Sequence, residues 1–159
     1  MHTETSIHIK ADPMTVYRYA AATERWPEIL PHYRWVHLLD QEGNNKLVEM
    51  AANRNFYIAN WPVRWWAKQT NIAEEPRVTF THVGGITKGM EVEWLFEPTD
   101  DGVKVTIVHD LVLKWPIIGG FAATWVVGPL FVDAIAGTTL RRVKELIEAG
   151  HPAPDGVAT

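Results

Sequence analysis

The sequence predicts an α+β domain in which a curved, seven-stranded antiparallel sheet wraps around a C-terminal helix. Six strand-like segments follow one another between residues 33 and 113, and short turn sequences join most of them. Residues 129–149 carry an apolar stripe at helical spacing, and one strand with two short helices precedes the six strands. Strands joined by short turns pair antiparallel, and an amphipathic helix must bury its stripe against the sheet.

The N-terminal region predicts one strand and two short helices. Residues 4–10 show the alternation of a strand. Asp12 and Pro13 then form a helix start, because aspartate caps a helix and proline suits its first position. We expect this helix to continue through about Ala21. A second short helical piece begins at Thr23 and ends at the second proline of WPEILP.

The six later strands and the terminal helix follow from local patterns. The predicted strands occupy residues 33–41, 46–54, 63–73, 77–84, 89–98 and 103–113, and the turns between them include EGNN, EEP, GITK and TDDG. The stripe of the terminal helix consists of Leu130, Ala136, Leu140, Val143 and Ile147. A curved sheet that wraps around such a helix leaves room for an internal pocket.

Length and composition limit the possible function classes. The 159 residues suit one domain, predicted over residues 1–150, and residues 151–159 are expected to form a mobile tail. The absence of cysteine excludes disulfides, thiolate metal sites and a cysteine nucleophile, and it fits a cytoplasmic location. A net charge of −4 without a basic block argues against a nucleic-acid partner.

One uncharged segment needs weighing as a membrane span. Residues 115–132 carry no charge over 18 residues, which is close to the length that crosses a bilayer. Prolines and paired glycines interrupt the segment, so we expect a buried segment or a lid that could touch a membrane without spanning it. Exposed aromatic surface near Trp115 and Trp125 would favour a homodimer, and a monomer remains equally open.

The order of elements and two local patterns resemble the START-like superfamily, which has the helix-grip fold of the birch pollen allergen and is also called SRPBCC. The patterns are ADPMTVYRYAAATERWPEILPHYRWV near the start and FVDAIAGTTLRRVKELIEA at the end. Within the superfamily the chain looks most like the polyketide cyclase/dehydrase group, which includes aromatase/cyclases, over roughly residues 4–149. The resemblance implies a long C-terminal helix. It leaves the function open, because the superfamily includes cyclases, lipid and quinone carriers and hormone receptors.

Strand alternation predicts which side chains face the pocket. Successive side chains of a strand point to opposite faces, so the apolar rows of the later strands should point inward. These rows contain Phe80 and His82, then Met90 and Trp94, and finally Ile107 and His109.

His109 has two readings. It could be a buried neutral histidine that is bonded within the core, or it could be a base in the pocket. Histidine suits the second role because its unperturbed pKa is about 6.5. For His82, which is close to a Gly-Gly turn, a structural or rim position is favoured over a catalytic one.

Asp133 also has two readings. Its helical neighbours, Leu130 among them, are small or apolar, and a carboxylate on such a face is costly unless it is paired. It could be satisfied by a hydroxyl or an arginine, or it could point into the pocket with Leu130 beside it.

The resemblance adds roles for several of these residues. Some aromatase/cyclases place a histidine on the last strand and an aspartate on the terminal helix inside the cavity, and His109 and Asp133 fall on these positions. Tyr33 matches a cavity tyrosine. Three tryptophans match or approach cavity positions, although plain packing explains each of them equally well: Trp26, Trp66 and Trp94.

The chain departs from the aromatase/cyclase pattern on the strand at residues 63–73. Such enzymes carry an inward arginine there, and this sequence aligns Thr70 with it. Lys68 or Arg64 could replace the charge, although a lysine lacks the planar fork of an arginine.

The leading functional hypothesis is a cyclase/dehydratase that needs no cofactor and acts on a hydrophobic poly-keto compound. His109 and Asp133 would move protons, Tyr33 would stabilise a negative oxygen, and an acyl carrier protein could deliver the substrate. No metal-binding or nucleotide-binding motif is present. The alternative is a non-enzymatic carrier for a lipid, a quinone or another hydrophobic metabolite.

Overall fold

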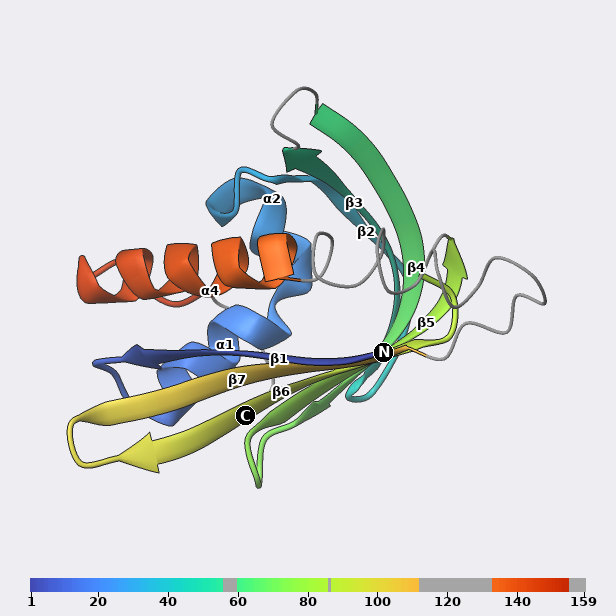
Figure 1. Ribbon diagram of the computed structural model, residues 1–159. Coiled ribbons are helices and arrows are strands. Elements are labelled where there is room, and N and C mark those ends of the chain that lie inside the picture. The colour runs from blue at the N-terminus through green and yellow to red at the C-terminus, as the bar shows by residue number, and fades with distance from the viewer. Residues whose placement is uncertain (56–59, 86, 112–132, 155–159) are drawn as a thin grey trace.

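The computed structural model describes residues 1–55, 60–85, 87–111 and 133–154 (Figure 1). The elements, in chain order, are β1 (His2–Ile9), α1 (Pro13–Ala21), the 3₁₀ turn η1 (Thr23–Arg25), α2 (Trp26–Ile29), β2 (Tyr33–Glu42), β3 (Asn45–Asn55), β4 (Asn60–Ile72), β5 (Arg77–Gly85), β6 (Met90–Thr99), β7 (Gly102–Leu111) and α4 (Asp133–Glu148).

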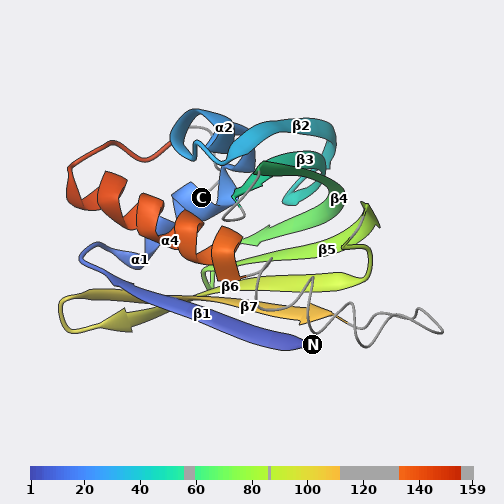
Figure 2. The ribbon, with the colours of Figure 1, turned by 45° about the horizontal axis from the view of Figure 1, so that its top comes forward.

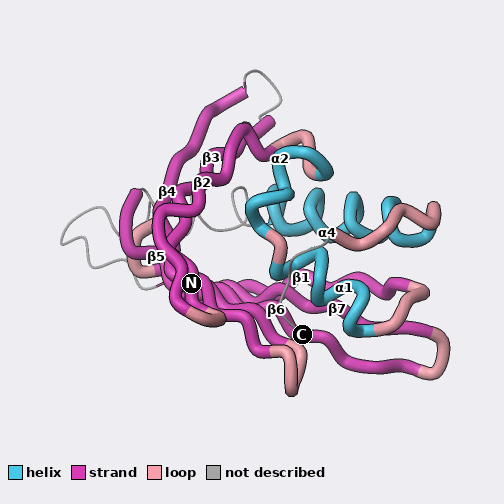
Figure 3. The backbone as a smooth tube through the Cα atoms, turned by 180° about the vertical axis from the view of Figure 1, so that it is seen from behind, coloured by secondary structure: helices cyan, strands magenta, loops and turns pink. Residues whose placement is uncertain are grey.

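The seven strands form one antiparallel sheet in the order β1-β7-β6-β5-β4-β3-β2. The predicted α+β class and the seven antiparallel strands are therefore confirmed. Figure 2 shows that the sheet curves, with β2, β3 and β4 turning away from the plane of β1, β6 and β7. The three labelled helices all lie on its concave side (Figure 3).

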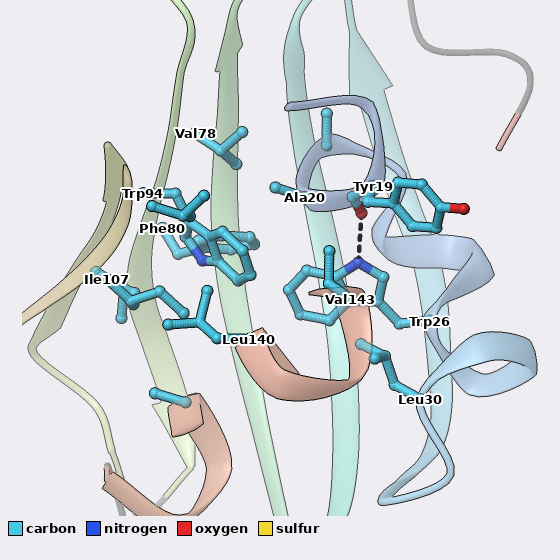
Figure 4. Close-up of a cluster of buried hydrophobic side chains, with 14 of the residues drawn as sticks. Tyr19, Ala20, Trp26, Leu30, Val78, Phe80, Trp94, Ile107, Leu140 and Val143 are labelled. Carbon is cyan, nitrogen blue, oxygen red and sulfur yellow. Dashed lines mark hydrogen bonds between the residues drawn. The ribbon is translucent and has the colours of Figure 1, made fainter. Parts of the chain in front are cut away.

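The N-terminal helices follow the predicted capping pattern. The Asp12 side chain accepts a hydrogen bond from the Met14 amide at 3.1 Å, and Pro13 occupies the first turn of α1. The second helical piece differs from the prediction, since it divides into η1 and α2. The Trp26 indole donates to the Tyr19 carbonyl at 2.8 Å (Figure 4), and this bond joins the start of α2 to α1.

Helix α4 lies along the concave face and is fastened to β1. Its 16 residues bury Ala136, Leu140 and Val143, as the stripe predicts. The Lys144 ammonium donates to the His8 carbonyl at 2.7 Å. The part of the predicted helix before Asp133, including Leu130, lies outside the described residues, and so does the segment 115–132 with Trp115 and Trp125.

The beginning of the predicted tail contacts the body of the domain. The Tyr19 hydroxyl lies 2.8 Å from the His151 carbonyl and 3.0 Å from the Pro152 carbonyl, and can donate to either. Residues 155–159 lie outside the described residues. Among the helices that the structure describes, none has the length and apolar character that a membrane crossing needs.

A buried aromatic cluster joins the helices to the sheet (Figure 4). The Trp26 ring lies 6.1 Å from the Phe80 ring and 5.9 Å from the Trp94 ring, measured between centroids. Leu140 and Val143 of α4 are buried in the same cluster. Because the cluster draws on α2, β5, β6 and α4, it sets the distance between the helices and the sheet, and a pocket lies beside it.

Candidate functional site

A pocket lies between the concave face of the sheet and the first two turns of α4. It contains about 540 Å³ of empty space, counted together with the solvent that reaches into it. No Asp, Glu, Lys or Arg is among the described side chains that line it. These are Trp26, Tyr33, Met50, Trp65, Phe80, His82, Met90, Val92, Trp94, Ile107, His109, Ile135, Ala136 and Thr139.

All of the predicted site residues on α2, β2, β5, β6 and β7 line this pocket. They are Trp26, Tyr33, Phe80, His82, Met90, Trp94, Ile107 and His109. Alternation within β5, β6 and β7 brings them to one face, and the register places Val92 of β6 between Phe80 and His109 on the neighbouring strands. Their chemical roles remain predictions.

The predicted inward positions on β4 are wrong by one residue. Trp65, Ala67 and Gln69 are buried on the concave side, whereas Trp66 and Thr70 are half-buried and Lys68 is exposed on the other face. A shift of one residue in a strand moves every side chain to the opposite face. Trp66, Lys68 and Thr70 therefore do not line the pocket.

Gln69 is one of the two inward residues beside the position expected for the arginine, and its side chain is engaged in hydrogen bonds within the fold. Its amide nitrogen donates to the Ala21 carbonyl at 2.9 Å and to the Asn71 side chain at 2.8 Å. Its oxygen accepts from the Thr23 hydroxyl at 2.7 Å. The fully buried side chain thus fastens the end of α1 to the sheet.

Arg64 does not supply the missing charge either. Its guanidinium lies 4.6 Å from the centre of the Trp66 ring and 3.6 Å from the Glu49 carboxylate. The side chain is 57% exposed on the convex surface. Hydrogen-bond donors on neutral side chains must therefore serve a ligand in the described part of the pocket.

Several lining residues were not predicted from the sequence. The sequence predicts Trp66 rather than Trp65 as the inward ring. The pair of adjacent tryptophans does indicate that one of the two rings points inward. The Trp65 ring stacks on His82, with 5.9 Å between centroids and 9° between planes. Thr139 stands on α4 one turn beyond Ala136, and only this spacing marks it. The others are Met50 and Ile135, whereas Val92 and Ala136 belong to a strand row and a helix stripe that were predicted to face inward.

His109 lies in the wall of the pocket and is 8% exposed. Its Nδ1 atom is buried and has no hydrogen-bond partner within the described residues. Burial lowers the pKa of His109 to about 4, and the neighbouring Asp110 carboxylate opposes this effect. At neutral pH the imidazole is therefore an uncharged base.

His82 is the second imidazole in the wall. Its Nδ1 atom lies 2.6 Å from the Thr87 hydroxyl. Burial lowers the pKa of His82 to about 3, and the proximity of His109 adds to the shift. The bond to Thr87 agrees with the predicted structural role, and the ring also faces the pocket.

Tyr33 is held on the far side of the pocket by aromatic contacts. The Trp26 ring meets it edge-on, with centroids 5.0 Å apart, and the His32 ring lies 4.8 Å away. Burial raises the pKa of Tyr33, and the proximity of the Thr139 hydroxyl opposes the increase. Tyr33 is therefore a neutral phenol at physiological pH.

Asp133 is the first residue of α4, and its side chain lies outside the described part of the structure. Its predicted partnership with His109 stays a prediction, and so does the position of Leu130. Within the described residues, no three histidine or acidic side chains gather in a way that could hold a metal ion.

Comparison with known proteins decides the family. Residues 9–128 match the model of the family described as "Polyketide cyclase / dehydrase and lipid transport". The chain belongs to this family. The resemblance noted in the sequence is thereby confirmed.

Individual relatives agree with the family assignment. A Streptomyces cyaneus protein named "Putative polyketide cyclase" is 27% identical over 115 residues, which are 71% of this chain and 74% of that protein. The granaticin polyketide synthase bifunctional cyclase/dehydratase of Streptomyces violaceoruber is 25% identical over 96% of this chain, and the match spans 45% of that protein.

A solved structure supports the fold. The Zhui aromatase/cyclase of Streptomyces sp. R1128 superposes with a TM-score of 0.80 and covers 99% of both chains at 17% sequence identity. At this level of sequence identity, the superposition establishes the fold alone. The chemistry has to be argued from the residues of the pocket.

Proposed function

We propose that this polyketide cyclase family member binds a hydrophobic poly-keto compound and catalyses its aldol cyclisation and dehydration without a cofactor. The observation that supports this most is His109, an uncharged imidazole in the wall of an aromatic pocket whose Nδ1 atom has no hydrogen-bond partner among the residues that the structure describes. The cyclase and dehydratase names of the relatives are consistent with such a substrate.

The proposed reaction begins with proton removal. His109 takes a proton from a carbon between two carbonyls, and the resulting enolate carbon attacks a second carbonyl of the same molecule. A carbon–carbon bond forms, and the new alkoxide receives the proton from the His109 imidazolium. Because the pKa of His109 is lowered to about 4, the imidazolium returns its proton readily.

Dehydration follows at the same site. A second proton leaves the carbon beside the new hydroxyl, a carbon–carbon double bond forms, and the hydroxyl departs as water after it is protonated. His109, with Asp133 as its predicted partner, would carry both proton transfers. The Tyr33 hydroxyl would donate to the oxygen that becomes negative.

The aromatic side chains would set the fold of the substrate. Trp26, Trp65 and Trp94 stand on three different elements around the pocket. Holding a flexible chain with its reacting carbons close together removes a large entropic part of the barrier. Trp65 takes the place that the sequence assigned to Trp66.

Turnover of a poly-β-keto thioester, either on an acyl carrier protein or on a pantetheine analogue, tests the proposal. We expect His109→Ala and Asp133→Asn to abolish cyclisation while thermal unfolding stays cooperative. His37→Ala is the matched control, because this histidine also stands on a strand but is 61% exposed. Unchanged turnover in both pocket variants would refute the proposal.

A carrier function is the second candidate, and the uncharged lining of the described pocket favours it. In this case His109 and Tyr33 only orient the polar end of a lipid, a quinone or another hydrophobic metabolite. Native mass spectrometry of the freshly purified protein separates the two functions. A co-purified intact lipid, together with no conversion of the keto thioester, would establish the carrier.

A further inference from the structure

We infer that the His82 imidazole is a fixed hydrogen-bond donor to a carbonyl oxygen of the ligand, and that the Thr87 hydroxyl holds the ring in its donating form. His82 touches the ligand in this arrangement, whereas Thr87 is a positioning residue that acts through His82. The inference rests on the proposed function for the class of ligand, a ketone beside an acidic carbon.

Two contacts fix the position of the His82 ring. Its Nδ1 atom lies 2.6 Å from the Thr87 hydroxyl, and the two residues are 6% and 0% exposed. The Trp65 ring lies nearly parallel to the imidazole, with 5.9 Å between centroids and 9° between planes. His82 and Trp65 both line the pocket, so the fixed ring forms part of its wall.

The backbone around this pair holds Thr87 close to the ring. The register of β4 against β5 shifts just before Ala67, the residue opposite His82. Such irregularities redirect side chains and are common next to functional sites. In the turn that follows β5, the His82 carbonyl accepts from the Gly89 amide at 2.9 Å, and the Thr87 carbonyl accepts from the Met90 amide at 3.0 Å. The turn therefore returns the Thr87 side chain to the strand that carries the imidazole.

The direction of the hydrogen bond follows from counting hydrogens. Within the described part of the chain, the Thr87 hydroxyl is hydrogen-bonded to His82 alone. If the imidazole donated to this oxygen, the hydroxyl hydrogen would be buried without an acceptor, which is costly. The hydroxyl therefore donates to Nδ1. Burial lowers the pKa of His82 to about 3, so the ring is neutral and carries its single N–H on Nε2.

The protonated Nε2 atom of His82 is available to a ligand. Among the residues that the structure describes, the side chain of His82 is hydrogen-bonded only through Nδ1. Nε2 is one of the two ring atoms farthest from the main chain, and the ring extends from the concave face of β5 into the pocket wall. The bond from Thr87 polarises the ring, which strengthens the Nε2–H donor by roughly 10–30%.

Two of the other neutral donors in the pocket wall are engaged within the fold. The Trp26 indole donates to the Tyr19 carbonyl at 2.8 Å, and the Thr139 hydroxyl lies 2.8 Å from the His32 Nε2 atom. His82 thus supplies a free N–H in a pocket whose described lining carries no charged donor.

The place of His82 in the sheet gives this donor a role beside His109. Only β6 separates β5, which carries His82, from β7, which carries His109, whereas Tyr33 begins β2 at the far edge of the sheet. A ketone oxygen at His82 places the adjacent carbon in the half of the pocket that contains His109. A donor at this oxygen stabilises the enolate that forms when the carbon loses its proton, and a neutral imidazole can serve as this donor. Tyr33 is then left to the second carbonyl, which the enolate attacks.

NMR of protein with ¹⁵N-labelled histidine tests the position of the proton. At neutral pH we expect long-range ¹H–¹⁵N correlations to place the proton of His82 on Nε2, with the Nδ1 resonance displaced by a donor. Thr87→Val should remove this displacement, and Thr87→Ser, which keeps the hydroxyl, should retain it. His82→Phe assigns the resonances by removing them. A proton on Nδ1 of the native protein would overturn the inference.

The carbonyl stretching frequency of bound 2-acetonaphthone tests the contact with the ligand. Binding is followed by quenching of tryptophan fluorescence, and the frequency is read by infrared spectroscopy with a ¹³C-labelled carbonyl. In the native protein we expect a frequency below that of the ketone in hexane, because a donor lengthens the carbonyl bond. His82→Phe should abolish this shift, and Thr87→Val should reduce it by roughly 10–30%.

Matched variants separate positioning from packing. Thr87→Ser should keep the native carbonyl frequency, and Thr81→Val removes an exposed hydroxyl beside His82 and should leave both spectra unchanged. A lowered frequency that persists in His82→Phe, or no binding of the ketone to the native protein, would overturn the inference. Turnover enters neither measurement, so full activity of His109→Ala and Asp133→Asn would refute the proposed function alone.

Discussion

His82 and His109 stand on β5 and β7, on either side of β6, and both present neutral imidazoles to one pocket. Burial lowers the pKa of each, and the proximity of His109 adds to the shift of His82, whereas the Asp110 carboxylate opposes the shift of His109. The His82 ring stacks on the Trp65 ring, and no carboxylate is among the described side chains that line the pocket. The described lining of the pocket is therefore uncharged at neutral pH and gains positive charge when acid protonates the two rings.

Acid should destabilise the fold through these histidines. Their pKa values are 6.5 in the reference state and about 3 and 4 in the folded protein, so the unfolded chain binds more protons between pH 6.5 and 4. The free energy of unfolding therefore falls as pH decreases through this window and is fully recovered above it. Urea titrations at pH 4.5, 5.5 and 7 should show a flatter pH dependence for His109→Gln, with a difference of about 1–3 kcal/mol. The exposed His37→Gln control should keep the native slope, and equal slopes in all three proteins would contradict the assignment.

The corrected face of β4 predicts opposite effects for two adjacent tryptophans. Trp65 lines the pocket and Trp66 packs on Gly84 at the other face. We expect Trp65→Leu to weaken binding of 2-acetonaphthone roughly tenfold, the equivalent of about 1.4 kcal/mol of lost aromatic contact. Trp66→Leu should leave the affinity within about twofold of the native value. The dissociation constants come from isothermal titration calorimetry, and equal losses in both variants would restore the original assignment of Trp66.

Gln69 should contribute to stability in a way that Thr70 does not. Replacing Gln69 by Leu removes its hydrogen bonds to the Ala21 carbonyl and the Thr23 hydroxyl, and each lost bond should cost about 0.5–1.5 kcal/mol. Thr70→Val removes only a bond to the Asn45 side chain near the surface, and its cost should stay within about 0.5 kcal/mol. Chemical denaturation of both variants measures the contrast. A native midpoint for Gln69→Leu would show that the network does not anchor α1.

Two glycines with positive φ allow the stability cost of a left-handed backbone to be distinguished from the cost of a steric clash. Gly43 has a φ of 59° with open space beside it, and Gly85 has a φ of 86°. A Cβ atom at Gly85 would collide with the Arg64 carbonyl on the paired strand β4. Gly43→Ala should cost about 1–2 kcal/mol from the left-handed backbone alone, and Gly85→Ala should cost clearly more. Thermal unfolding compares the two, and a smaller loss at Gly85 would rule out the close approach.

The strands that were predicted with the right face share one property. In β5, β6 and β7 the inward row is apolar apart from its histidines, and the outward row of β6 carries Glu91, Glu93 and Glu97. Because only one face of such a strand can be buried favourably, the alternation determines which side chains face the core. The type of each element follows from such local patterns, and so does most of the pocket wall.

The errors arose where a residue depends on a distant partner. The inward row of β4 contains polar Gln69 and Asn71, while Trp66 is on the outward row, so hydrophobicity alone points the wrong way. Gln69 can be buried because its side-chain amide donates a hydrogen bond to the Ala21 carbonyl, 48 positions away in the chain. Thr139 is a similar case, because no pattern in the neighbouring sequence predicts its hydrogen bond to His32.

The contact between His32 and Thr139 joins residues 107 positions apart in the sequence. During synthesis, all seven strands have been made by Leu111, yet α4 does not begin until Asp133. The wall that carries Thr139 is therefore the last to be translated. A growing chain on the ribosome therefore has its strands available for pairing before this wall of the pocket has been made.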